Sequence, residues 1–163
     1  MMNEQAKKQA LRMIPYGLYV LTARSEDRGE PGVNAALVSW VSQASFDPPR
    51  IVVALGNETG IWHRVRKAGN FVLNVLGSGQ KEIATAFFRG VGEAGETLAG
   101  YHYHNGVVGA PILDDAPAYL ECRVVESLNA GDHTLFLAEV VEAGVQHDLP
   151  PLRLEETAWH YGG

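Results

Sequence analysis

Cysteine, basic charge and long apolar runs are all scarce in this sequence, and each scarcity excludes a class of protein. The 163 residues include one cysteine, Cys122, so an internal disulfide cannot form, which fits a reducing cytosol. The formal net charge of −6 argues against a nucleic-acid-binding protein, which needs a basic surface. No apolar run approaches membrane-spanning length, and the N-terminus lacks the pattern of a signal peptide. We therefore expect a cytoplasmic protein that contacts neither nucleic acid nor membrane.

Repeats, low-complexity stretches and linkers are also missing, so we expect one domain spanning residues 1–163. Hydrophobic residues make up 46% of the chain, enough for a full core without covalent cross-links. Cys122 lies in an apolar run and is predicted to be a buried small hydrophobe, because no partner for a reactive thiol is apparent.

Hydrophobic periodicity and turn residues predict more strands than helices. A helix over 80–88 would turn Ile83, Ala84 and Phe87 inward, and a helix over 61–68 would begin at the N-cap Thr59. The glycine-rich stretch 89–105 is predicted to be a long functional loop. Only the middle of the chain alternates between strand and helix, and the hairpin signals favour a mostly β, antiparallel Greek-key barrel or sandwich with peripheral helices. The remaining expected elements are a helix over 3–14 and strands over 16–23, 33–46, 50–55, 71–76, 119–128, 134–145 and 155–161.

The strand expected over 33–46 has an unusual composition. It combines the small Ala35 and Ala36 with hydroxyl and amide side chains such as Ser39, Ser42 and Gln43. Small residues let a flat aromatic ligand approach the backbone, and polar groups can bind the edge of such a ligand. A tightly packed strand whose serines bond to backbone has the same composition, so both interpretations stay open.

A second candidate is the turn 56–60, which opens the helix expected over 61–68. The start of a helix presents free backbone N–H groups and favours an anion, and Arg64, Arg66 and Lys67 follow closely. An ordinary capped surface helix is the alternative. The helix end at Phe87-Phe88-Arg89 is equally open: it provides either an aromatic wall with a cation, or a core-facing pair followed by a solvated arginine.

A third candidate is His133, which follows Gly131-Asp132 at the turn between the two long apolar runs. It could serve chemistry or simply bond to its own backbone. His102 and His104 lack a third ligand at suitable spacing, so no metal site is predicted. A hydrolase is disfavoured because no Gly-x-Ser-x-Gly motif is present. The glycine spacing at 90–95 imitates a dinucleotide-binding motif, but it follows a helix rather than a strand.

Six segments, taken in order, resemble the flavin reductase-like family of FMN-binding split barrels. The resemblance runs from Tyr16 to Tyr161, and Ser39–Phe46 is most similar to the flavin reductase domain at the carboxyl end of diflavin flavoproteins. The segments are Gly17–Thr22, Val38–Pro49, Asn70–Leu76, Gly109–Leu113, Ala118–Val125 and Gly131–His133.

The resemblance implies an antiparallel split β-barrel, a homodimer and a flavin near the subunit interface. His133 would be the catalytic residue and would flank the nicotinamide together with Tyr161. The residues implied in flavin binding are Asn34, Ala35, Ala36, Val38 and Ser39 at the ring and ribityl chain, Ala54, Leu55 and Gly56 close by, Thr59, Gly60 and Ile61 at the phosphate, and Ala86, Phe87 and Arg89 on the far side.

The implied activity is that of an NAD(P)H:flavin oxidoreductase, which would use FMN, or FAD, and would supply reduced flavin or electrons to a partner oxygenase or another acceptor. The choice between FMN and FAD stays open because Thr59-Gly60-Ile61 departs from the hydroxyl–x–hydroxyl pattern often seen in the family. Two alternatives remain: an FMN-binding electron-transfer protein without useful NAD(P)H turnover, and a binding module that has lost the flavin.

Overall fold

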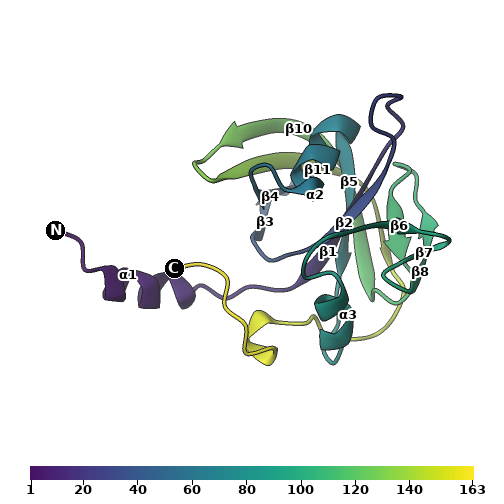
Figure 1. Ribbon diagram of the computed structural model, residues 1–163. Helices are drawn as coiled ribbons and strands as arrows, with labels where there is room; N and C mark the ends of the chain where they lie inside the picture. Colours follow the sequence, from purple (N-terminus) through teal and green to yellow (C-terminus); the bar gives the residue numbers. More distant parts are fainter.

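The computed structural model describes all residues from Met1 to Gly163. Its eleven strands join edge to edge in the order β3-β4-β11-β10-β5-β1-β2-β6-β7-β8-β9, with antiparallel pairing throughout. The helices lie off the sheet (Figure 1). In chain order the elements are α1 (Glu4–Arg12), β1 (Tyr19–Ser25), β2 (Gly32–Val38), β3 (Val41–Ser45), β4 (Arg50–Gly56), α2 (Gly60–Ala68), β5 (Asn70–Val75), α3 (Lys81–Ala86), β6 (Val91–Ala94), β7 (Thr97–Leu98), β8 (Tyr101–Asn105), β9 (Pro111–Leu113), β10 (Ala118–Asn129), β11 (His133–Val145) and a 3-10 turn η1 (Leu154–Glu156).

The hydrophobic core consists of two large clusters, which the central strand β1 separates, and a third cluster of three buried residues. Successive side chains of a strand point to opposite faces. Accordingly Val20 packs with Phe87 and Leu113 in what we call the first core cluster. Leu21 packs with Phe71 in the second core cluster. Strand β1 lies between β2 and β5, and its apolar residues are buried on both faces. The mostly β, antiparallel prediction is confirmed.

Local sequence signals account for α2 and its position. Thr59 is the N-cap and accepts a hydrogen bond from the Trp62 amide, as predicted. Gly69 ends the helix in the left-handed conformation at φ 71°, which glycine adopts without a steric penalty. Ile61 and Val65, one turn apart, are buried and fasten the helix to the second core cluster.

The segment 33–46, predicted to be a strand that runs into a bend, is two separate strands in the structure. The strand breaks at Ser39-Trp40: β2 pairs with β1, whereas β3 pairs with β4. The Trp40 carbonyl accepts a hydrogen bond from the Ala54 amide in the adjoining strand. The two halves belong to opposite stretches of the sheet, so the chain must turn between them.

Two predictions were wrong. The stretch 89–105 is not irregular but contains β6, β7 and β8, whose ladders are short and mostly exposed. The final strand expected over 155–161 is the turn η1 followed by irregular chain. Thr157 bonds through its hydroxyl to the Leu154 carbonyl, which closes the turn instead of extending the chain.

The helix α1 has no buried residue and projects from the barrel (Figure 1). The C-terminus returns to it, where the Arg12 side chain donates to the Gly162 carbonyl at 3.3 Å. No helix of the structure is long and apolar enough to cross a membrane.

Candidate functional site

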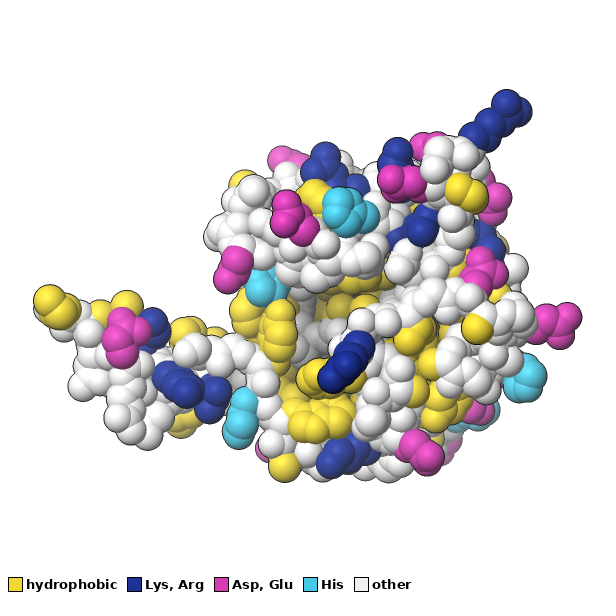
Figure 2. Space-filling model, in the orientation of Figure 1, with side chains coloured by type: hydrophobic (Ala, Val, Ile, Leu, Met, Phe, Trp, Pro, Cys, Tyr) yellow, Lys and Arg dark blue, Asp and Glu magenta, His cyan; other side chains and the backbone are white.

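A cavity of about 480 Å³ opens on one face of the barrel, and Figure 2 shows it as a hollow lined with apolar side chains. Its volume lies within the range of small-molecule binding sites. Its walls come from β2, the break after β2, the end of β4, the start of α2, the segment 88–92 and the C-terminal residues 159–161. The predicted flavin-binding residues that line it are Asn34, Ala35, Ala36, Val38, Ser39, Ala54, Leu55, Gly56, Thr59, Gly60, Ile61, Arg89 and Tyr161.

Ala86 and Phe87 lie elsewhere. Phe87 directly follows α3 and is fully buried in the first core cluster, which contains Val20, on the same side as Ile83 and Ala84 of that helix. That inward orientation is what the helical periodicity predicts, and it excludes the side chain from the cavity wall. Phe88 lines the cavity in its place, and Ala86 faces a smaller hollow beside the cavity.

Small residues shape one wall of the cavity. Asn34, Ala36 and Val38 alternate along β2 and share one face of the strand. Gly90 approaches that face closely, since a Cβ added there would lie 3.9 Å from the Ala36 Cβ. Ala54 contributes a second methyl side chain from β4. This wall lets a flat ring lie close to the backbone.

The start of α2 provides hydrogen-bond donors at the cavity. The amides of Gly60 and Ile61 belong to the first turn and have no acceptor within the chain, whereas Thr59 satisfies the next amide, that of Trp62. Glu58 is exposed and does not line the cavity. An anion beside this helix start would therefore meet free N–H groups and the positive end of the helix dipole.

Asn34 and Arg64 extend this set of donors. Arg64 donates through Nε to Asn34 Oδ1 at 2.8 Å, which leaves the Asn34 Nδ2 group facing Gly60. A Cβ at Gly60 would come within 3.1 Å of that nitrogen, so glycine preserves the space between them. The other two predicted cations lie away from the helix start: Arg66 covers the Trp62 ring, and Lys67 pairs with Asp27. Only Arg64 is brought to the site.

His133 forms a hydrogen-bonded chain with its neighbours at the mouth of the cavity. Its Nδ1 atom lies 2.7 Å from Asp132 Oδ1, and its Nε2 atom lies 2.6 Å from the Tyr161 hydroxyl. His133 does not line the cavity itself, but Tyr161 does. Burial, and secondarily the Asp132 carboxylate, raises the pKa of Tyr161, so its hydroxyl keeps its proton to a higher pH than that of a free tyrosine.

Trp40 packs against this pair and was not predicted as a site residue. Its ring centroid lies 4.5 Å from that of His133 and 4.9 Å from that of Tyr161. The indole N–H is buried without an acceptor. In the sequence Trp40 was noted only as part of the segment Val38–Pro49, which resembles the family. Its contacts with His133 and Tyr161 depend on the strand break, which no local signal predicts.

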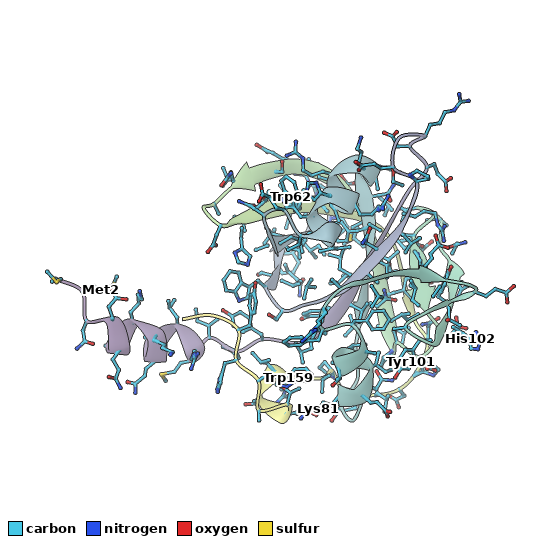
Figure 3. The ribbon with its side chains drawn as sticks, in the orientation of Figure 1. Met2, Trp62, Lys81, Tyr101, His102 and Trp159 are labelled. Atoms are coloured by element: carbon cyan, nitrogen blue, oxygen red, sulfur yellow. The ribbon has the colours of Figure 1, made fainter.

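Asn57 joins the His133 turn to the start of α2. Its amide donates to the Asp132 carbonyl at 2.9 Å, and its Nδ2 group donates to the Gly131 carbonyl at 2.8 Å. The Thr134 hydroxyl donates to Asn57 Oδ1 and accepts from the Trp62 indole, which lies on α2 (Figure 3). Asn57, Thr134 and Trp62 were missed because their partners are distant in the sequence.

The candidate metal ligands do not assemble into a site. His104 contacts Asp114 through Nδ1 at 2.8 Å, and no group of three or more His, Cys, Asp or Glu side chains is placed to hold a metal ion. The chemistry of the site is therefore that of its apolar wall, its free N–H groups and the His133 chain.

The fold and the site suit one class of protein, a β-barrel that holds a flat, phosphate-bearing cofactor. The chain belongs to the family described as the flavin reductase-like domain, which it matches over residues 11–160. The resemblance noted from the sequence is confirmed.

Among curated relatives, the chain is 36% identical over 140 residues to diflavin flavoprotein A 1 of Synechocystis, covering 85% of this chain and 24% of that protein. It is 36% identical over 127 residues to the reductase component of 4-nitrophenol 4-monooxygenase/4-nitrocatechol 2-monooxygenase of Rhodococcus opacus, covering 78% and 64% respectively. The chain thus spans about a quarter of the diflavin relatives it matches.

Among solved structures, the flavin reductase of styrene monooxygenase from Pseudomonas putida S12 superimposes with a TM-score of 0.75. It is 28% identical in sequence, and the match covers 95% of each chain. The predicted barrel fold is confirmed by this likeness.

Proposed function

We propose that this protein is an NAD(P)H:flavin oxidoreductase that binds FMN, or FAD, and accepts a hydride from a nicotinamide nucleotide. The observation that carries the proposal is the cavity itself, where a wall of small side chains adjoins the free amides of Gly60 and Ile61. A flavin needs both a close, flat surface and an anchor for its phosphate.

The residues present fit a flavin phosphate. Gly60, Ile61 and the Asn34 Nδ2 group supply donors, and the Arg64 guanidinium adds positive charge beside them. Asn34, Ala36, Val38 and Ala54 would lie along the ring system, with Ser39 at its polar edge. When bound, a flavin supplies hydride acceptance and onward electron transfer. Both FMN and FAD carry the phosphate that this anchor would hold.

The chain's own contribution is to orient two rings and to exclude water from between them. Asp132 holds His133 Nδ1, so that Nε2 faces the cavity mouth and binds the Tyr161 hydroxyl. We assign His133 and Tyr161 to the nicotinamide, as hydrogen-bonding and packing partners of the carboxamide and ring. Trp40 packs against both rings, tilted to that of His133 and edge-on to that of Tyr161.

We also propose a homodimer and an acceptor protein. Met13 and Ile14, which directly follow α1, are exposed apolar side chains, and Leu128 and Val145 are exposed on the long hairpin β10–β11. Such surfaces are typical of protein interfaces. The Rhodococcus relative is named as the reductase component of a monooxygenase, which makes an oxygenase that receives reduced flavin the partner we favour.

Titration with flavin followed by a nucleotide-oxidation assay tests the proposal. We expect FMN or FAD to bind, detected by its visible spectrum and by fluorescence quenching, and NADH or NADPH to be oxidised steadily when free flavin is added. Failure to bind either flavin would refute the proposal. Flavin binding without oxidation of either nucleotide would support the electron-transfer alternative, which the names of the diflavin relatives also suit.

A further inference from the structure

His133 is separated from the cavity by a side chain of the C-terminal residues. Its Nε2 atom lies near the cavity wall, since a Cβ added at the wall residue Gly56 would lie 4.0 Å from it. The Tyr161 hydroxyl nevertheless lies 2.6 Å from the same nitrogen, and Tyr161 lines the cavity whereas His133 does not. A ligand in the cavity therefore reaches His133 Nε2 only after the Tyr161 hydroxyl has left it.

Residues 158–163, which we call the strap, carry Tyr161 across the mouth of the cavity. Residues 159–161 line the cavity, and the chain then continues to α1, where Figure 1 shows the C-terminus. The helix anchors this end of the strap, because Arg12 Nε donates to the Gly162 carbonyl at 3.3 Å. The strap is thus attached to the rest of the protein through Tyr161 at the site and through Gly162 at α1.

Few bonds hold the strap in place. None of its residues belongs to a helix or a strand, and none takes part in a hydrogen bond between backbone groups. Ala158, at its start, has the left-handed backbone conformation at φ 63°, which is unfavourable for a residue other than glycine. Tyr161 is 47% exposed. Segments with so few contacts open at a small fraction of the free energy that global unfolding requires.

Closure of the strap also leaves a polar group without a partner. The centroids of the Trp40 and Tyr161 rings lie 4.9 Å apart, and the Trp40 N–H group is buried without an acceptor. Gly162 covers the adjoining part of the indole, because a Cβ added there would lie 3.6 Å from Trp40 Cζ2. A buried donor without an acceptor is unfavourable. The closed strap therefore depends on the bonds made by Tyr161 and Arg12.

We propose that the strap is closed in the free protein and that the nicotinamide nucleotide opens it, by replacing the Tyr161 hydroxyl at His133 Nε2. A carboxamide both donates and accepts hydrogen bonds, so it matches either protonation state of that nitrogen. The inference rests on the proposed function, because the group that replaces the hydroxyl must belong to a nicotinamide. Since the nucleotide binds only to open molecules, its apparent affinity is reduced by the fraction of molecules that are open.

Two substitutions should open the strap. Arg12→Gln removes its anchor on α1, and Tyr161→Phe removes the hydroxyl but keeps the ring. Arg28→Gln is the matched control, because Arg28 is an exposed cation between β1 and β2 and lies outside the cavity. The first readout is the rate at which diethyl pyrocarbonate modifies His133 in the flavin-free protein, measured by peptide mass spectrometry. The exposed His102 is the internal reference.

We expect His133 to react more slowly than His102 in the unmodified chain and in Arg28→Gln. In Arg12→Gln and Tyr161→Phe, His133 should react about fivefold faster, because each substitution removes one hydrogen bond that keeps the strap closed. The second readout is the KM for NADH or NADPH, measured with free flavin. It should fall by a similar factor in both variants, since more of the molecules are open.

A rise of KM in Tyr161→Phe would overturn the inference, because the hydroxyl would then hold the nucleotide instead of excluding it. Equal rates of His133 modification in every variant would overturn it too, as would faster modification with an unchanged KM. The modification rates require neither flavin nor nucleotide, so these results are distinct from failure of the proposed function. That failure, in which no variant and no unmodified protein binds flavin or oxidises a nucleotide, would refute both.

Discussion

The two ring nitrogens of His133 contact different side chains. Nδ1 contacts the Asp132 carboxylate, and Nε2 contacts the Tyr161 hydroxyl. Because the His133 side chain lies outside the cavity wall, its removal should spare the flavin. We predict that His133→Ala raises the KM for the nicotinamide nucleotide by roughly tenfold, the value of one lost hydrogen bond in a partly buried site. Flavin affinity, measured by fluorescence titration, should change less.

His102→Ala is the control for His133→Ala, because the His102 side chain is exposed on β8, away from the cavity. The control should leave both quantities unchanged. A larger effect of His133→Ala on flavin affinity than on KM would contradict the role we assign to His133.

Arg64 donates a hydrogen bond to the side-chain oxygen of Asn34. This bond orients the Asn34 amide group toward the start of α2. We predict that Arg64→Gln weakens FMN binding by about tenfold and leaves riboflavin binding unchanged, because riboflavin lacks the phosphate. Arg66→Gln is the matched control, since the Arg66 guanidinium covers the Trp62 ring instead. Equal losses for FMN and riboflavin would show that Arg64 supports the ring site or the fold, and not the phosphate.

At the scale of elements, the helix α1 is the part with the least internal support. None of its residues is buried, and Leu11 on the helix together with Met13 and Ile14 directly after it are exposed apolar side chains. We predict that deletion of residues 1–14 weakens self-association at least about tenfold, since the buried area of several apolar side chains would be lost. Light scattering coupled to size-exclusion chromatography measures the change.

Lys8→Ser, on the polar face of α1, is the control for this deletion and should leave self-association unchanged. Circular dichroism of the shortened chain checks that the barrel still folds. A shortened chain that remains dimeric at the same concentrations would assign the interface to another surface.

Elements with their own local signals were the predictable part of this fold. The helix α2 begins at a threonine and ends at a glycine, and the hairpin β10–β11 consists of two long apolar runs around one turn, so both were predicted within a residue or two. The break at Ser39-Trp40 depends on pairing with β4, which lies in another part of the sheet. Cavity residues on β2 and β4 were found through the family resemblance, whereas Asn57 and Trp40 act through contacts that only the folded chain creates.

At the scale of the whole molecule, the second core cluster contains the single cysteine. Burial, and secondarily the Glu121 carboxylate, raises the pKa of the Cys122 thiol from 9.0 to about 12. The unfolded chain therefore loses this proton near its ordinary pKa while the folded chain keeps it. The stability contributed by the protonated thiol is complete below about pH 9 and is lost as the pH rises toward 12.

We predict that the free energy of unfolding falls between about pH 8 and pH 10 by up to about 1.4 kcal/mol more in the unmodified chain than in Cys122→Ala. Urea denaturation at the two pH values measures this difference. The comparison within each protein cancels the fixed cost of the smaller side chain, and tyrosines that titrate in the same range affect both proteins equally. Parallel pH profiles would show that the thiol ionises normally in the folded chain.

Asn57 fastens the turn that carries His133 to the turn that opens α2, through backbone and side-chain bonds to both. A shift in either turn is therefore transmitted to the other, so under the proposed function a substitution that displaces Asn57 should alter the nicotinamide KM and the flavin-phosphate affinity together.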